Sequence, residues 1–168
     1  MTIAETPTAP KRMLAPLAKV RAAVPEDFES IMELCEQIYE ENGAVNVDWG
    51  IVENKIIQGV NGVNSCVGVI GNPIQGMIYL QFSSLWYSND LVLEELFLYV
   101  PKEYRNTRNA QALLEFAKDC SDRLNVPLLI GIISNQRTAA KIRLYERLLG
   151  PMSGAFFLFN GKTGSDGV

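Results

Sequence analysis

The sequence contains no histidine, so its chemistry must rest on other side chains. Imidazole acid/base catalysis, Ser-His-Asp or Cys-His hydrolysis and histidine-ligated zinc are therefore excluded. Two adjacent carboxylates, Glu94 and Glu95, interrupt an apolar run from Leu91 to Val100 that is typical of a β-strand. Because neighbouring strand residues face opposite sides, at least one of these glutamates should meet a covered face, where desolvation raises its pKa.

Positive side chains gather directly after this strand, at Lys102, Arg105 and Arg108. They flank the start of a predicted helix near Thr107, where free backbone amides favour an anion. The pattern therefore predicts a binding site for a small polyanion such as a pyrophosphate. The alternative is an arginine-rich helix start that is only solvated by water.

Charge is divided unevenly along the 168 residues, whose formal net charge is −4. The stretch 22–54 holds nine acidic residues and no Lys or Arg, whereas the stretch 102–162 holds ten basic and five acidic residues. A protein that grips a long nucleic acid would be basic throughout, so no nucleic-acid partner is predicted. The division suits a polyanion at one end and a cationic amine at the other, unless both faces are merely solvated.

The three cysteines, Cys35, Cys66 and Cys120, lie dozens of residues apart and form no C-x-x-C pair. This spacing argues against a disulfide framework and against a thiolate metal site, so no metal is predicted. We interpret them as small buried hydrophobes in a reducing cytosol. No apolar run suits a secretion signal or a membrane span, which predicts a cytoplasmic protein without a membrane partner.

Hydrophobic periodicity predicts the elements that position these groups. The length fits one domain over 19–162, with tails at 1–18 and 163–168. The predicted order is β-α-α-β-β-β-α-β-α-β, which indicates an α/β fold with a mixed central sheet. Strands are expected at 20–23, 65–70, 75–82, 91–100, 126–133 and 155–160, and helices at 25–42, 48–58, 107–124 and from Ser134 or Asn135 to 149.

This order resembles the GNAT superfamily of N-acetyltransferases, above all from Leu91 to Leu149. In that family a strand L-x-V leads into a loop Q/R-x-x-G-x-G/A and a long helix. Here Leu98-Tyr99-Val100 leads into Arg105-Asn106-Thr107-Arg108-Asn109-Ala110, and a later helix carries Leu144-Tyr145-Glu146. The resemblance implies a GNAT-like mixed sheet flanked by helices.

It also implies acetyl-CoA as cosubstrate, with its pyrophosphate at the loop 105–110 and its pantetheine along 98–100. Asn135 is expected to contact pantetheine or only to cap the last helix. The implied activity is acetyl transfer to a primary amine of a small molecule or a basic side chain by direct attack. A backbone N–H near Leu98 or Tyr99 would hold the oxyanion.

Such a transfer needs a proton acceptor for the amine and a proton donor for the leaving thiolate. Glu94 is the preferred base, because alternation places it on one strand face with Leu98 and Val100, and Glu95 is the alternative. The family places a tyrosine in the last helix, so Tyr145 is the expected acid unless it belongs to the core.

Two departures from the family keep another function class open. Arg108 stands at the first glycine position of the loop, where its guanidinium is expected to contact a phosphate, and Ala110 stands at the second. One strand is predicted after the last helix where the family has two, so the sheet is either shortened or completed by a partner in a homodimer. The alternative is a catalytically weak CoA-binding or protein-interaction module. Acetylation of aminoacyl-tRNA is disfavoured by the acidic half.

Overall fold

The computed structural model describes residues 17–134, 137–155 and 157. Up to the last helix, its elements follow the predicted order, with the addition of two short 3-10 helices. In chain order they are β1 (Val20–Ala22), η1 (Pro25–Asp27), α1 (Phe28–Asn42), α2 (Trp49–Val60), β2 (Ser65–Ile70), β3 (Gly76–Ser84), β4 (Leu91–Tyr99), η2 (Lys102–Tyr104), α3 (Asn109–Leu124), β5 (Leu128–Leu129) and α4 (Thr138–Leu149).

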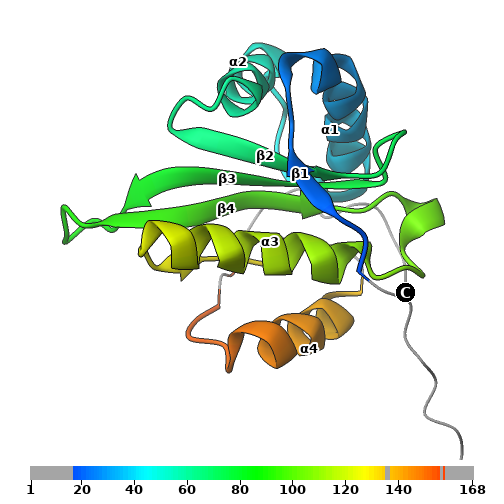
Figure 1. Cartoon of the computed structure of the whole chain (residues 1–168). Coiled ribbons are helices and arrows are strands. Elements are labelled where there is room, and N and C mark those ends of the chain that lie inside the picture. The colour runs from blue at the N-terminus through cyan, green and yellow to red at the C-terminus, as the bar shows by residue number, and fades with distance from the viewer. Residues whose placement is uncertain (1–16, 135–136, 156, 158–168) are drawn as a thin grey trace, which may run out of the picture.

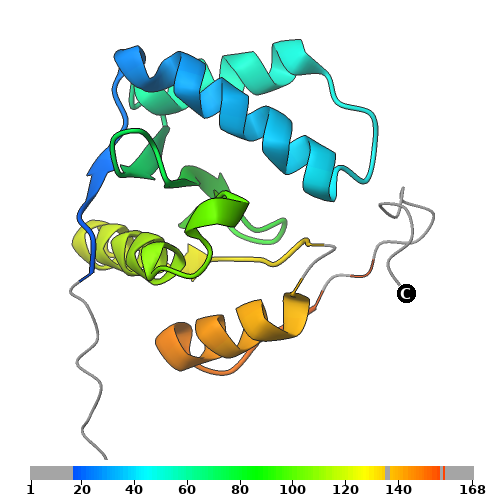
Figure 2. The same cartoon turned by 90° about the vertical axis from the view of Figure 1, so that its right-hand side faces the viewer.

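The described strands form one sheet in the order β1-β2-β3-β4-β5. The first three junctions are antiparallel and the last, between β4 and β5, is parallel. Helices α1 and α2 cover one face of the sheet, while α3 and α4 lie on the other (Figures 1 and 2). The predicted α/β class with a mixed sheet is therefore confirmed.

The first five residues of β3, 76–80, are buried on both faces and separate two apolar cores. Met77 and Tyr79 pack with the residues beneath α1 and α2, whereas Ile78 and Leu80 pack with the residues beneath α3. This alternation follows from the two-residue period of a strand. Burial of each core stabilises the fold by roughly 25 cal/mol for every Å² of apolar surface removed from water.

Gly68 of β2 allows α3 to approach the sheet closely. A Cβ added there would lie 2.7 Å from the ring of Phe116, which is closer than real side chains pack. A larger residue would push α3 outward or tilt the Phe116 ring. The position of α3, and with it the start of that helix, therefore depends on this glycine.

The predicted strand over 126–133 is wrong in length, because only Leu128 and Leu129 pair with β4. Beyond them the backbone N–H of Gly131 donates to the Glu95 carboxylate at 3.3 Å. The Gly131 N–H is thus bonded to a side chain, whereas in a longer strand it would donate to a backbone carbonyl. Of the last predicted strand, Ala155 and Phe157 carry no strand assignment, and 156 and 158–160 lie outside the described residues, as do 1–16 and 163–168 of the predicted tails.

The cysteine prediction is right for one residue and wrong for two. All three thiols are free, and Cys35 is buried as expected, but Cys66 and Cys120 are only half-buried. These two lie at the margin of the core beneath α3, where their thiols interact with each other. Residues at the margin of a core keep part of their surface in water even when their type suggests full burial.

Candidate active site

A cleft opens where β4 and β5 part. The two strands pair only at Leu93 with Leu128 and at Glu94 with Leu129, and the chains then diverge. The cavity between them has a volume of about 590 Å³ and is lined by the rest of β4, the segment 129–134, the loop after β4, α4 and the end of α1. Its size falls within the range of small-molecule sites. Within the described residues, no strand covers the edge of β4 that faces this cavity.

The pairing of β4 with β3 is irregular at Leu96. Glu95 pairs with Leu80, whereas the next paired position joins Phe97 to Tyr79. Leu96 is therefore an extra residue in the strand, as in a β-bulge. Such an irregularity changes which residues before and after it share a face of the sheet.

This bulge overturns the predicted alternation of the two glutamates. Glu94 was expected on one face with Leu98 and Val100, but the register places Glu95 on that face. Glu94 lies instead on the face of Tyr99, toward α1 and α2. The prediction is wrong in this respect because simple alternation assumes a strand without an inserted residue.

Glu95 occupies a largely desolvated position in the cleft. Burial raises its pKa to about 7, although the hydrogen bond from the Gly131 N–H and the nearby Lys141 charge oppose this shift. A carboxyl group with such a pKa exchanges a proton readily near neutral pH. Its position suits a general base better than the position of Glu94, whose carboxylate accepts a hydrogen bond from Gln81 Nε2 at 3.2 Å.

Tyr145 reaches the same cleft from α4. Burial raises the pKa of its phenol, and the nearby Glu95 charge adds to the effect. The phenol therefore keeps its proton at neutral pH and is available as a donor. The structure thus brings together Glu95 and Tyr145, which are fifty positions apart in the sequence.

Only part of the predicted phosphate loop lines the cleft. Arg105, Thr107 and Ala110 do so, as do Leu98, Tyr99 and Val100 of the strand before the loop. Asn106 and Arg108 lie outside the lining, and Arg108 donates from Nε to Gln111 Oε1 at 3.3 Å. Helix α3 begins at Asn109, two residues later than predicted, with Arg108 at the N-cap position.

Two further predicted contacts fall elsewhere. Asn109 is buried, and its side-chain amide donates at 3.5 Å to the backbone oxygen of Gln75. It therefore holds the start of α3 against the turn before β3 rather than lining the cleft. Asn135 lies outside the described residues.

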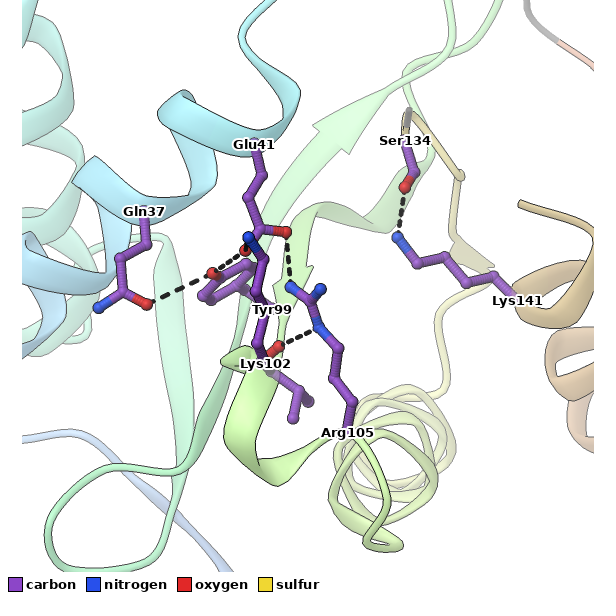
Figure 3. Close-up of polar contacts among 8 residues, drawn as sticks. Gln37, Glu41, Tyr99, Lys102, Arg105, Ser134 and Lys141 are labelled. Carbon is purple, nitrogen blue, oxygen red and sulfur yellow. Dashed lines mark hydrogen bonds and ion pairs between the residues drawn. The ribbon is translucent and has the colours of Figure 1, made fainter. Parts of the chain in front are cut away.

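Glu41, at the end of α1, is a site residue that the sequence does not single out. Its carboxylate accepts hydrogen bonds from Arg105 Nη2 at 2.6 Å and from the Tyr99 hydroxyl at 2.8 Å (Figure 3). Burial opposes ionisation of Glu41, but the hydrogen bonds from Arg105 and Tyr99 lower its pKa overall. In the sequence, Glu41 is one more acid in a run of nine, so no local signal distinguishes it.

Arg105 is consequently held by three contacts. Its Nε donates to the backbone oxygen of Val100 at 2.9 Å, and its guanidinium lies 5.6 Å from the centre of the Tyr99 ring. The Glu41 carboxylate binds the remaining edge (Figure 3). These contacts fix the one predicted phosphate-binding arginine that does line the cleft.

The described residues offer neither a metal site nor a membrane-spanning helix. Within the described ranges, no group of three or more His, Cys, Asp or Glu side chains is placed to hold a metal ion. In that part of the chain there is also no helix with the length and apolar character needed to cross a membrane.

Solved structures share this fold. The chain is similar to a candidate acetyltransferase from Arthrobacter sp. FB24, with a TM-score of 0.64 and 22% identity over 86% of this chain and 97% of that one. Arabidopsis thaliana NAA60, solved with a bisubstrate analogue, matches with a TM-score of 0.63 and 17% identity over 79% and 83% of the two chains. AAC(6')-Iy, solved with the bisubstrate analogue CoA-S-monomethyl-acetylneamine, matches with a TM-score of 0.65 and 9% identity over 86% and 97%.

No family model matches the sequence, and no curated protein matches it either. The likeness is therefore one of fold. The chain has the fold of the GNAT acetyltransferases, as the resemblance of the stretch 91–149 predicts.

Proposed function

We propose that this protein is an acetyl-CoA-dependent N-acetyltransferase that acts on a primary amine of a small molecule or a basic side chain by direct attack. The observation that carries the proposal is the meeting of Glu95 and Tyr145 in one cleft, beside the uncovered edge of β4. A proton acceptor and a proton donor at one place are what an acyl transfer to an amine requires. The fold shared with acetyltransferases supports the same activity.

The chain's own groups fit the cosubstrate. The edge of β4 over 98–100 faces the cleft, and an extended chain with amide groups, such as pantetheine, pairs with such an edge as an added strand. Arg105 lies at the end of this edge and offers a charge to the pyrophosphate. When bound, acetyl-CoA supplies an activated thioester, and a backbone N–H near Leu98 or Tyr99 would stabilise its carbonyl oxygen as negative charge develops.

Glu95 and Tyr145 would divide the proton transfers between them. Glu95, with its pKa raised by burial to about 7, accepts the proton that the amine loses on attack. Tyr145, whose pKa burial keeps high, gives its proton to the departing thiolate. Glu95 then releases its proton and the Tyr145 phenolate takes one up, so that both groups return to their starting states.

The acceptor side of the cleft is formed by the end of α1. Glu41 and Asn42 line the cavity there, and Glu94 lies on the neighbouring strand face. Because Glu41 is already paired with Arg105, the Glu94 carboxylate, which also lines the cavity, is the group that attracts a cationic amine before the reacting nitrogen loses its proton. We therefore favour an acceptor that carries more than one amine, or an amine on a basic peptide.

Thermal shift and thiol release test the proposal. Acetyl-CoA at about 100 times its Kd should stabilise the protein by about 2.7 kcal/mol, because it binds only the native state. ATP should stabilise it less, and an equal effect would indicate a generic anion site. An amine panel should then release free thiol from acetyl-CoA. Binding without release from any amine would favour the CoA-binding module, and no binding would refute both.

We also propose how the chain is organised and where it acts. We expect residues 19–162 to act as one domain, in the cytoplasm, with a homodimer as the predicted assembly. Light scattering coupled to size-exclusion chromatography would test the homodimer, and a single cooperative unfolding transition would support one domain.

A further inference from the structure

The cleft contains a primary amine of the protein itself. Lys141, on α4, lines the cavity, and it is the one lysine that does so among the described residues. Its Nζ donates to Ser134 Oγ at 2.5 Å, so the amine is directed into the cleft (Figure 3). A lysine whose amine is held inside a reaction cleft is positioned differently from the solvated lysines of a protein surface.

Charged groups from three other segments act on this amine. Glu41 of α1 and Glu95 of β4 favour its charged form, whereas Arg105, in the loop after β4, and Arg137, the N-cap residue of α4, oppose that form. Desolvation acts in the same direction as the two arginines and is the largest effect, so the pKa of Lys141 lies below its usual value. A larger share of the amine is therefore neutral and nucleophilic than at an exposed lysine.

Lys141 lies close to Glu95 and Tyr145, the two residues proposed for proton transfer. Lys141 and Glu95 act electrostatically on each other, and Glu95 acts on Tyr145, so the three side chains lie near one another in the cleft. The residues proposed to transfer protons for an external amine therefore also lie beside Lys141, an amine of the protein itself. Effective concentrations within a folded site exceed those of free reactants, so an internal amine competes strongly when no acceptor is present.

We propose that the protein acetylates its own Lys141 when acetyl-CoA is bound and no external acceptor is present. The neutral Nζ attacks the thioester carbonyl, a nitrogen–carbon bond forms and the carbon–sulfur bond breaks. The proton of the attacking amine passes to Glu95, and the thiolate takes a proton from Tyr145. The products are acetyl-lysine at position 141 and free coenzyme A. This inference rests on the proposed acetyltransferase function.

The reaction would limit itself. Acetylation removes the charge of Lys141 and places an additional acetyl group in a cleft of about 590 Å³. That group would occupy space next to Glu95 and Tyr145, where an external amine must enter. A fully acetylated protein should therefore turn over an external acceptor more slowly than fresh protein.

Mass analysis of the intact protein and its peptides tests the proposal. The full chain is incubated with acetyl-CoA alone, and acetylation is followed at Lys141 and at Lys118, which is exposed on α3 and serves as control. We expect Lys141 to react at least about tenfold faster than Lys118, because its amine lies in the cleft that binds the thioester and reacts without a diffusional encounter. Its rate constant should not depend on protein concentration, because the reaction is intramolecular. Equal rates at the two lysines, or a rate that rises with protein concentration, would overturn the inference.

Two variants separate this inference from the proposed function. Lys141→Arg keeps the positive charge, so it should retain the thermal shift with acetyl-CoA and lose the early acetyl incorporation. Tyr145→Phe should slow acetylation of Lys141 and leave the slow reaction of Lys118 unchanged. If the parent binds acetyl-CoA and acetylates an amine of the panel but leaves Lys141 unmodified, only the inference fails. If acetyl-CoA gives no thermal shift, the proposed function fails with it.

Discussion

The part of the chain before β5 and the part that begins with β5 are held in different ways. The first part, from β1 to α3, packs two buried cores against both faces of the sheet. The second joins the sheet through only Leu128 and Leu129, and none of the described residues of α4 is fully buried. The cleft lies at the junction of these two regions, with Glu95 supplied by the first and Tyr145 by the second.

This difference means that one side of the cleft, the edge of β4, is held firmly, whereas the other side, α4, is held less firmly. The cores fix β4, its bulge and the loop that carries Arg105. Helix α4 has fewer apolar contacts to lose, so separating it from the sheet costs less free energy than unfolding the cores. The entry of a ligand between the two should therefore depend on the second region.

The largest expected effect tests the contrast in packing. Leu113 of α3 is fully buried, so Leu113→Ala should lower the free energy of unfolding by about 2–5 kcal/mol. Leu148 of α4 is only half-buried, and Leu148→Ala should cost less than about 1 kcal/mol. Urea unfolding of both variants measures the difference. Equal losses would show that α4 is held as firmly as the cores.

The next effect concerns the pH dependence of stability at the junction. Burial raises the pKa of Glu95 from 4.5 to about 7, so the unfolded state releases this proton first as pH rises. The free energy of unfolding should therefore fall between pH 4.5 and about 7, by up to about 3 kcal/mol, and the loss is complete above that range. Glu95→Gln should remove this fall and make the protein more stable than the parent at pH 8.

The control for this pH dependence is Glu94→Gln, on the opposite face of β4. Glu94 is the neighbouring residue in the sequence, but in the Glu94→Gln variant the free energy of unfolding should still fall between pH 4.5 and 7. Urea unfolding at several pH values compares the three proteins. A fall that disappears in Glu94→Gln and remains in Glu95→Gln would reverse the assignment of faces made by the bulge.

Tyr145 tests whether the second region contributes to the reaction. Tyr145→Phe should lower kcat roughly 10²-fold, which is about 2.7 kcal/mol of activation free energy, and leave the Kd for acetyl-CoA nearly unchanged. The matched control is Tyr87→Phe, since Tyr87 is 68% exposed and outside the cleft lining. Steady-state kinetics and a binding titration measure both values. An unchanged kcat with a lowered Tm would place Tyr145 in packing only.

The smallest expected effect distinguishes two arginines of the predicted phosphate loop. Arg105→Ala should weaken binding of acetyl-CoA about tenfold, because the charge-assisted hydrogen bond proposed between its guanidinium and the pyrophosphate would be lost. Arg108→Ala should weaken it less than about threefold, because its side chain lies outside the lining and contacts Gln111. Calorimetry with both variants compares the losses. A larger loss for Arg108→Ala would mean that the loop presents Arg108 to the ligand when it binds.

Local patterns in the sequence determined most of the elements. Helical spacing of apolar residues placed α1, α2 and most of α3, and the apolar runs placed β2, β3 and β4 close to their observed bounds. The candidates Glu95, Arg105 and Tyr145 could be named from residue type and from the resemblance. These features depend on neighbours a few positions away, which the sequence displays directly.

Only the tertiary structure decided which face each candidate meets. The bulge at Leu96 depends on the register with β3, and it exchanges the faces of Glu94 and Glu95. The bond between Glu41 and Arg105 joins residues 64 positions apart, and the Gly131 N–H, just beyond β5, donates to the side chain of the distant Glu95. These features depend on strand pairing and on burial between segments that lie far apart in the sequence. A local pattern of residues does not contain the free energies that decide between such arrangements.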